Sequence, residues 1–533
     1  MSDGVPVTGW GRRLARNTLL AATGRAVTLA SWWWLTPLVL RALGAEGFAV
    51  WALFFALTGY LAALDLGLVQ GTLRHVAAAR QRGEVRAASA FVTLGVMGFV
   101  ILGVLWLLLV LALRAPLLAW LHVPEAQVAA ADVAMRGGAA VVVLAGVANV
   151  LMAALQGHDR FDLANALSLV VVTVHAAGVL LALRMGAGLP GLVVAVGAGW
   201  AVGAIAGAIA LTARIPGGGF VGWSVARPHL REALAFGGPM QLAGMLSMLH
   251  VQLDKFLLPG MVALAAVTPY ELGSRVPGSL QTFPLMLLLA MLPAAASLHA
   301  AGDRTRLREL FLRGSRYLLI ATSVLVAALV VVAERLFAVW LGPGHAEAAL
   351  VMRGVTLATG LALSTGMGTV AVRAIGRTDL EAGFAAIVLG LHIALSRALI
   401  PGHGLTGAVV ALLVANAIAC PVFMFRMAGA LGWSRREVLF TVVEREEKYK
   451  VKNVIDNVVF RGSDALSGWL FHALRGAGLE AEQADRRRHR ELEEVARADQ
   501  RRGCGNTMLL AGDAVQQVGE PGIEIDLDND GES

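Results

Sequence analysis

Charged residues are scarce in this chain of 533 residues, at 15% of the sequence. A soluble domain uses roughly 25% charged residues, most of them on its surface. Hydrophobic residues make up 57% of the chain, and the mean hydropathy is +0.69. The shortage of charge therefore excludes an ordinary soluble globular protein and predicts that much of the surface faces lipid.

Cysteine is nearly absent, with only Cys420 in an apolar run and Cys504 near the C-terminus. Two cysteines are too few for a disulfide framework or a thiolate metal site. The sequence also lacks a nucleophile elbow, a phosphate-binding glycine loop with lysine, and the ligand spacing of a metal site. We therefore expect a protein that is not an enzyme and that binds neither a cofactor nor a metal.

Long apolar segments recur along the chain, each close to the 20 or so residues that cross roughly 30 Å of hydrocarbon. They predict an all-α polytopic membrane protein with about twelve transmembrane helices. The segments lie near residues 17–40, 46–70, 89–112, 134–156, 163–184, 190–213, 236–258, 276–298, 317–340, 348–372, 380–400 and 404–428.

Arginine is distributed unevenly among the connections between these segments. Arginine is most abundant in alternate connections such as residues 74–86 and 304–316, although one of these connections has only Arg160, and the intervening connections are sparser. Cytoplasmic loops retain Lys and Arg, so the alternation predicts a multi-pass inner-membrane protein with both termini in the cytoplasm. The net charge of +7 then belongs to loops near anionic lipid, and we expect no nucleic-acid partner.

The connection after the sixth segment is the longest and begins Pro216-Gly-Gly-Gly219. It divides the chain into a six-helix bundle at 1–214, a cytoplasmic linker at 215–235, a second six-helix bundle at 236–430, and a charged, partly helical tail at 431–533 that is appended or disordered. Two bundles joined by one linker are a common transporter plan, with the substrate site between the halves.

Short motifs follow one another in a characteristic order: Arg16–Leu20, Arg41–Gly44, Gly47–Phe48, Leu64–Leu68 with Arg74, Leu155–Gly157 with Arg160–Phe161, Phe236–Pro239 and Gln252–Leu258. Over residues 12–430 the sequence resembles the polysaccharide-export flippases of the multidrug/oligosaccharidyl-lipid/polysaccharide (MOP) superfamily. The resemblance implies a MATE-like pair of bundles that moves undecaprenyl-diphosphate-linked oligosaccharides between leaflets by alternating access, for lipopolysaccharide, O-antigen or exopolysaccharide biosynthesis. It also implies membrane lipids, a polysaccharide polymerase and glycosyltransferases as partners.

The tail has a different character. Its residues 444–465 resemble a short segment of ATP:ADP antiporter-like transporters. Three lysines, Lys448, Lys450 and Lys452, lie there together, whereas Lys255 is the only lysine before them. We interpret the tail as an appended segment without an assigned role.

Ionisable groups inside membrane spans cost roughly 2.5–3.5 kcal/mol each and are therefore candidates for function. A diphosphate is best bound by cationic side chains. The candidates for substrate binding are Arg25, Lys255, Arg275 and Arg397. Alternatively, residues near helix ends extend to the interface, and Glu271–Arg275 and Asp254–Lys255 are local pairs; this alternative is open for Lys255 and Arg397.

Two carboxylates are candidates for ion coupling, Asp65 and Asp254. Asp65 lies among glycines, so a hinge at this position is an equal alternative. His175 lacks an acidic neighbour in sequence, which favours a packing role. Trp32, Trp33 and Trp34 could anchor the chain at the interface or stack on a saccharide.

Other functions are also compatible with the sequence. A drug or cation antiporter of the same superfamily would need an acidic, aromatic cavity, whereas the intramembrane candidates here are mostly basic. A membrane glycan polymerase or ligase would need an external catalytic surface, yet the longest outer connection, about 115–133, offers only His122, Glu125 and Asp132. A membrane scaffold whose tail recruits a partner is a third alternative.

Overall fold

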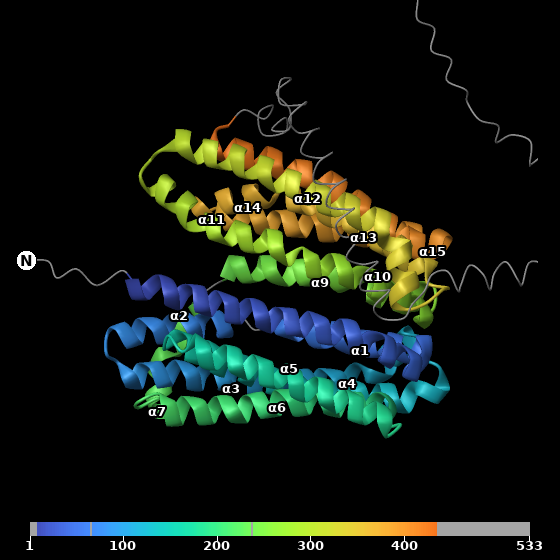
Figure 1. Ribbon diagram of the computed structural model, residues 1–533, viewed down its shortest axis with the longest axis horizontal. Helices are drawn as coiled ribbons and strands as arrows, with labels where there is room; N and C mark the ends of the chain where they lie inside the picture. Colours follow the sequence, from blue (N-terminus) through green and yellow to red (C-terminus); the bar gives the residue numbers. More distant parts are fainter. Residues whose placement is uncertain (1–7, 64–66, 236–237, 434–533) are drawn as a thin grey trace, which may run out of the picture. The chain divides into compact units, whose positions relative to one another are not determined.

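The computed structural model describes residues 8–63, 67–235 and 238–433, and these residues form only helices and the turns between them. All of them belong to one compact unit, Met1–Lys448. Two groups of helices lie side by side in this unit, the first built from α1 to α6 and the second from α9 to α15 (Figure 1). Asp65 and the tail at 434–533 are outside the described residues.

Helix α1 (Thr8–Ala63) reverses direction at Gly44. Gly44 has φ 69° and ψ −179°, a backbone conformation that is essentially restricted to glycine. Beyond it the chain returns along itself, since the rings of Trp32 and Phe55 meet edge to face with centroids 5.0 Å apart. The helix is therefore a hairpin of two membrane-crossing arms.

Helix α15 (Thr378–Leu431) is a second hairpin, which turns at Gly404 with φ 54° and ψ −130°. Its two arms pack antiparallel, as the 4.9 Å separation of the Phe384 and Phe423 ring centroids indicates.

The first bundle is completed by five further helices: α2 (Leu68–Gln81), α3 (Val85–Trp120), α4 (Glu125–Gly157), α5 (Phe161–Arg184) and α6 (Gly188–Arg214). Glycines at a four-residue spacing let α6 approach its neighbours closely. A Cβ atom added at Gly199 would lie 3.0 Å from the carbonyl oxygen of Val171 and 3.2 Å from the Cβ of His175. His175 in turn packs edge-on against Trp32, which confirms its predicted packing role.

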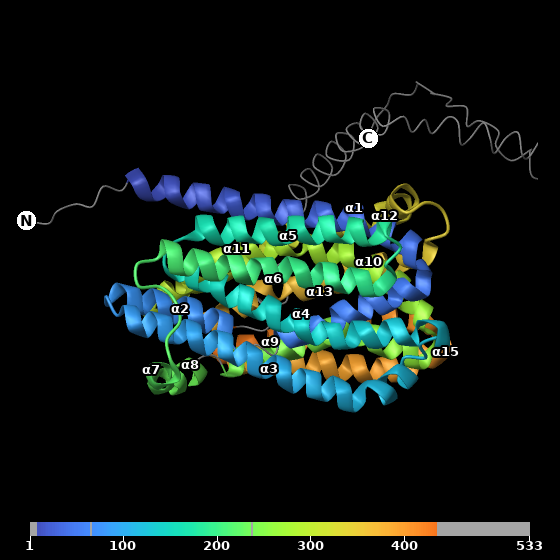
Figure 2. The same ribbon diagram turned by 90° about the horizontal axis from the view of Figure 1, so that it is seen from below.

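The linker between the bundles contains three short helices, α7 (Trp223–Ala226), η1 (Arg227–His229) and α8 (Leu230–Ala235). They lie beside the end of the first bundle that carries α2 (Figure 2). The backbone N–H of Val221 donates to the hydroxyl of Thr93, at 3.0 Å, and His75 lies 3.3 Å from the carboxylate of Glu232.

The second bundle contains α9 (Gly238–Met261), η2 (Leu264–Ala266), α10 (Val267–Leu280), α11 (Thr282–Ala300), α12 (Arg304–Trp340), α13 (Ala346–Ser364), α14 (Gly366–Ala374) and α15. Helix α10 continues into α11 across Gln281, and α13 continues into α14 across Thr365.

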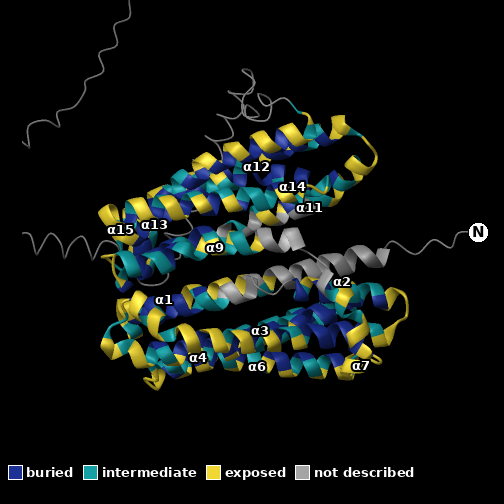
Figure 3. Cartoon of the chain, turned by 180° about the vertical axis from the view of Figure 1, so that it is seen from behind, coloured by how far each residue is buried: buried dark blue, intermediate teal, exposed yellow. Residues whose placement is uncertain are grey.

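Eight helical stretches in the described residues are long and apolar enough to cross a membrane. Two of them, α1 and α15, are hairpins and cross twice. With α9 and the α10–α11 pair, the count reaches twelve crossings, which confirms the predicted all-α fold of two six-helix bundles. Large apolar side chains such as Leu181, Ile205 and Val331 are exposed, and exposed positions follow outer helices such as α6 and α12 (Figure 3), where lipid would cover them.

Several helices extend beyond their predicted ends. Helix α12 begins at Arg304, whereas hydropathy predicts its start near 317. The stretch predicted as an outer connection, about 115–133, is helical except at 121–124. Hydropathy marks only the apolar part of a helix, and charged residues such as Arg and Glu continue a helix readily into the interface.

The two bundles touch near the turns at Gly44, 121–124, 262–266 and 341–345, which we call the closed end. Four contacts join them there: Trp120 Nε1 donates to the Phe256 carbonyl at 3.1 Å, His122 Nδ1 lies 3.2 Å from the Pro259 carbonyl, Thr268 donates to the Ala45 carbonyl at 2.6 Å, and Trp340 donates to the Trp33 carbonyl at 2.8 Å. The arginine-rich connections lie at the opposite end.

Candidate functional site

A cavity of about 360 Å³ lies inside the second bundle, between α9, α10, α13 and both arms of α15. The two-bundle plan predicts a substrate site between the halves, whereas the residues lining this cavity all lie between Ser247 and Asn416. Its polar lining is contributed by Ser247, His250, Lys255, Tyr270, Glu271, Ser274, Arg275, Gln281, Thr359 and Asn416.

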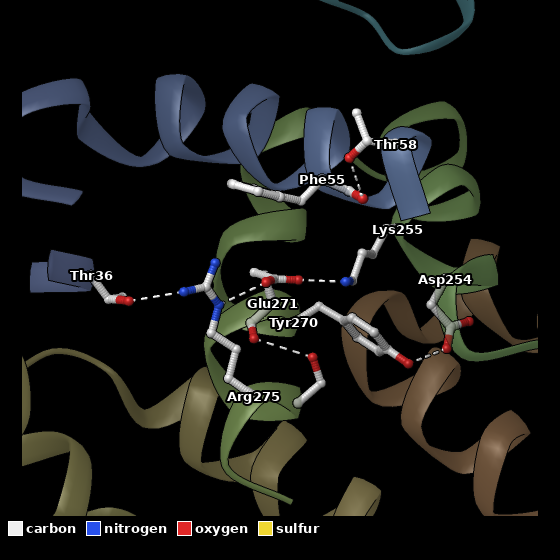
Figure 4. A network of polar contacts seen from close by, with 9 residues as sticks. Thr36, Phe55, Thr58, Asp254, Lys255, Tyr270, Glu271 and Arg275 are labelled. Carbon is white, nitrogen blue, oxygen red and sulfur yellow. Dashed lines mark hydrogen bonds and ion pairs between the residues drawn. The ribbon is translucent and has the colours of Figure 1, made fainter. Parts of the chain in front are cut away.

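Two cations at the cavity wall share one carboxylate. Lys255 Nζ on α9 lies 2.5 Å from Glu271 Oε2, and Arg275 Nε on α10 donates to Glu271 Oε1 at 2.7 Å (Figure 4). The Lys255, Glu271 and Arg275 side chains are only 10%, 8% and 20% exposed. We call these three residues the cavity triad; with two cations and one anion, it carries one net positive charge.

Helix α10 begins earlier than hydropathy predicts, at Val267 and not near 276. Glu271 and Arg275 therefore lie inside a helix, one turn apart on the same face. Their predicted pairing is confirmed, but the pair also includes Lys255, which the sequence could not show.

Arg275 also reaches the first bundle. Its Nη1 donates to the hydroxyl of Thr36 on α1 at 2.9 Å. The guanidinium carbon lies 5.2 Å from the ring centroid of Trp32 and 5.7 Å from that of Phe48, within the range of cation–π attraction. Arg275 thus connects the cavity of the second bundle to the wall of the first.

The sequence predicts that Trp32, Trp33 and Trp34 anchor the chain at the interface or stack on a saccharide. In the structure, two of these three rings contact other helices. Trp32 packs against Phe55, His175 and Arg275. Trp33 stacks on Trp340 of the second bundle, with centroids 4.0 Å apart. Trp33 and Trp34 are exposed, at 40% and 58%, and interfacial anchoring stays a prediction for these two residues.

Asp254 is completely buried and does not pair with Lys255. The two are adjacent on α9 and therefore point about 100° apart. Asp254 Oδ2 accepts a hydrogen bond from the hydroxyl of Tyr270 (Figure 4), and the hydroxyl of Ser396 lies 3.5 Å from Oδ1. The proposed Asp254–Lys255 pair was therefore wrong.

Two histidines lie next to this carboxylate. His392 Nε2 on α15 is 3.2 Å from Asp254 Oδ1, and both side chains are fully buried. The Nδ1 atom of His392 is 3.1 Å from Nδ1 of His250, which lines the cavity. Sequence reasoning missed both histidines as site residues. The pattern that could have identified them is a one-turn spacing on each helix, which pairs His250 with Asp254 and His392 with Ser396.

Arg397 is the one remaining candidate whose side chain the structure describes, and it lies apart from this site. Arg397 on α15 is exposed and is not among the residues that line the cavity, as the alternative of an interfacial arginine predicts. Arg25 lies on α1, but its side chain is outside what the structure describes. Of the predicted site residues, Lys255, Arg275 and Asp254 are brought together.

Comparison with solved structures identifies the fold. A MATE family transporter of the MOP superfamily in an inward-facing conformation matches with TM-score 0.63 and 18% identity, over 77% of this chain and 95% of that chain. The same class of transporter in an outward-facing conformation matches with TM-score 0.58 and 18% identity, over 79% and 95%. A variant of the Vibrio cholerae MATE transporter VcmN matches with TM-score 0.56 and 19% identity, over 80% and 98%.

No curated protein matches the chain in sequence. Residues 38–350, more than half of the chain, match the family described as polysaccharide biosynthesis protein. This match and the MATE fold confirm the resemblance predicted for residues 12–430, whereas the antiporter-like segment at 444–465 lies outside the described residues. The chain is a multi-pass membrane protein that belongs to the polysaccharide biosynthesis protein family.

Proposed function

We propose that this chain is a flippase that moves an undecaprenyl-diphosphate-linked oligosaccharide across the inner membrane by alternating access, for lipopolysaccharide, O-antigen or exopolysaccharide assembly. The observation that carries the proposal is the cavity triad, in which a buried lysine and a partly buried arginine share one carboxylate at a cavity wall. A diphosphate brings the negative charge that this arrangement lacks. Membership of the polysaccharide biosynthesis family supports a saccharide as the cargo.

Glu271 neutralises one of the two cations of the cavity triad. A diphosphate offers several oxygens to a guanidinium, whose planar fork binds phosphate in a bidentate manner. We expect the diphosphate to compete with Glu271 for Lys255 and Arg275.

Arg275 also couples the cargo to the first bundle. When it turns toward a diphosphate, it loses the Thr36 hydroxyl and the Trp32 ring. A ligand shifts a conformational equilibrium only through contacts that differ between the states, and this exchange of contacts is such a difference. Binding would thus favour separation of the bundles at the closed end.

The orientation follows from the arginine-rich connections, which favour the cytoplasmic side and lie opposite the closed end. The closed end is then periplasmic, and both termini are cytoplasmic. In this orientation the structure is shut toward the periplasm, the state that would load cargo from the cytoplasmic leaflet.

The drug or cation antiporter is less well supported, because the cavity carboxylate Glu271 is already bonded to two cations. A glycan polymerase or ligase lacks the expected outer surface, since the connection at 115–133 is reduced to residues 121–124.

Binding of undecaprenyl diphosphate by the purified full-length protein in detergent tests the proposal. Arg275→Ala should weaken binding about 10- to 150-fold, because a hydrogen bond to a charged group contributes about 1.5–3 kcal/mol. Arg275→Lys should recover part of the loss, since the charge remains while the fork is removed.

The matched control is Arg397→Ala, which removes an exposed arginine from the second bundle and should leave binding unchanged. Equal binding by Arg275→Ala and the unmodified protein, both shown to be monodisperse by size exclusion, would refute the assignment of the diphosphate to the cavity triad.

A further inference from the structure

The geometry points to a proton-exchange site inside the second bundle, in which His250 and His392 pass a proton between the cavity and the buried carboxylate of Asp254. This inference rests on the proposed transport function, since it names the ion whose movement would be coupled to the cargo. It assigns roles to the two histidines and makes the proton the ion that Asp254 takes up.

The groups form a continuous path from the cavity inward. His250 is partly buried and lines the cavity, whereas His392 and Asp254 are 0% exposed. The steps along the path are 3.1 Å, between the two Nδ1 atoms, and 3.2 Å, from His392 Nε2 to Asp254 Oδ1. Both are donor–acceptor distances over which a proton can be transferred.

The facing Nδ1 atoms restrict where hydrogens can lie. Two bare nitrogens at 3.1 Å would leave two lone pairs opposed, so one of the two Nδ1 atoms must carry a hydrogen. If His250 carries it, the hydrogen of neutral His392 is on Nε2, which faces Asp254. That arrangement is compatible with an ionised carboxylate.

Uptake of a proton then balances without any other reactant. A hydronium ion in the cavity gives a proton to Nε2 of His250 and leaves as water, and the Nδ1–H bond of His250 breaks as His392 Nδ1 gains that hydrogen. His392 releases its Nε2 hydrogen to Asp254 Oδ1, where an O–H bond forms. The histidines end neutral, and Asp254 becomes a carboxylic acid. The Nε2 atom is within ion-pair distance but not aligned as a hydrogen-bond donor, so a rotation of the His392 ring accompanies the last step.

The groups around Asp254 favour the binding of a proton over the binding of a metal cation. One oxygen accepts the hydroxyl of Tyr270, and the other faces a ring nitrogen and the hydroxyl of Ser396. These neighbours carry exchangeable hydrogens. A hard cation such as Na⁺ would instead need several oxygen lone pairs directed at one point, and the Tyr270 hydroxyl already directs its hydrogen at Asp254.

The charged and titratable groups facing the site come from three helices. Helix α9 contributes His250 and Lys255, α10 contributes Tyr270, Glu271 and Arg275, and α15 contributes His392. Helix α13 lines the cavity with Val355, Ala358, Thr359 and Ala362, none of which titrates. The cavity triad holds its own charges together, which leaves Asp254 as the carboxylate able to take up the proton.

A short chain of contacts can transmit the effect of protonating Asp254 to the first bundle. Tyr270, which bonds Asp254, directly precedes Glu271, and Glu271 holds Arg275 against Thr36 on α1. A carboxylic acid is a weaker acceptor for Tyr270 than a carboxylate is. Loading the proton should therefore shift α10 and alter the contact between the bundles.

The test is the distance across the closed end, measured by electron spin resonance on the full-length protein in liposomes without substrate. Spin labels are placed on Met185→Cys and Ala346→Cys, both exposed at the closed end, with Cys504 replaced by serine. Between pH 8 and pH 5 the ratio of the two distance populations should change by up to about tenfold per pH unit, the limit for one linked proton. Changing Na⁺ at fixed pH should leave the ratio unchanged.

Asp254→Asn should remove the pH response, and His392→Gln and His250→Gln should each reduce it. His175→Gln is the matched control, because His175 is a buried histidine of the first bundle outside the path; it should retain the full response. A pH-independent ratio in the unmodified protein, a response to Na⁺ alone, or an unaltered response in all three site variants would overturn the inference. Because no substrate is present, the result is independent of whether undecaprenyl diphosphate binds.

Discussion

Glu271 is the residue on which the electrostatics of the site depend. Its side chain is 8% exposed and holds Lys255 and Arg275 at 2.5 and 2.7 Å. Removing one partner of a buried ion pair leaves an uncompensated charge and typically costs about 3–5 kcal/mol. Here the loss of the carboxylate would leave two such charges close together.

Glu271→Gln should therefore lower the stability of the purified protein by at least about 3 kcal/mol, read as a drop in the thermal midpoint in detergent. Glu309→Gln is the control, since Glu309 pairs with Arg313 at an exposed position where an ion pair contributes at most about 1 kcal/mol. Equal effects of the two substitutions would mean that the cavity triad is solvated, contrary to the burial seen here.

The sequence identifies some of these residues but not their partners. Lys255, Arg275 and Asp254 stand out because an ionisable group in an apolar run is costly. Their partners depend on the rotation of each helix about its axis, which sends Lys255 toward Glu271 and Asp254 toward Tyr270. One sequence with few charges does not fix those rotations, so only the Glu271–Arg275 pair, one turn apart on one helix, could be predicted, whereas the third member Lys255 and the histidine path could not.

At the level of elements, two glycine turns determine how the long helices cross the membrane. Gly44 and Gly404 each reverse a helix with only the glycine itself out of helical conformation. Hydropathy predicted separate spans on either side, 17–40 and 46–70, and that division is confirmed. The helix ends were less predictable, because a helix continues past its apolar part wherever its charged residues reach water or headgroups.

Gly44→Ala should destabilise the protein by about 1–3 kcal/mol, since alanine does not readily adopt φ 69° with ψ −179°. Gly402→Ala is the matched control, because a Cβ there meets nothing within 4 Å and the residue does not have a positive φ. Thermal unfolding of both variants in detergent gives the comparison. If Gly44→Ala unfolds at the temperature of the unmodified protein, the turn does not require glycine.

At the level of the whole described unit, the two bundles meet at the closed end through Trp120, His122, Thr268 and Trp340. None of these contacts could be predicted from the sequence, because each joins residues more than 100 positions apart. The two-bundle plan could be predicted, since it follows from apolar runs and from one long linker. The cavity was expected between the bundles and lies inside the second one, with Arg275 as its link to the first.

The central claim is that the chain moves a diphosphate-linked saccharide between leaflets using Arg275. It is tested most directly in liposomes that contain the full-length protein and an undecaprenyl-diphosphate-linked oligosaccharide with a fluorophore on the sugar. A reductant that cannot cross the membrane bleaches only the outer-leaflet fluorophores. The unmodified protein and Arg397→Ala should make the inner-leaflet pool accessible as well, whereas liposomes with Arg275→Ala should bleach only to the extent of protein-free liposomes. Two results would contradict the account. One is that liposomes with the unmodified protein bleach no further than protein-free liposomes; the other is that liposomes with Arg275→Ala bleach fully.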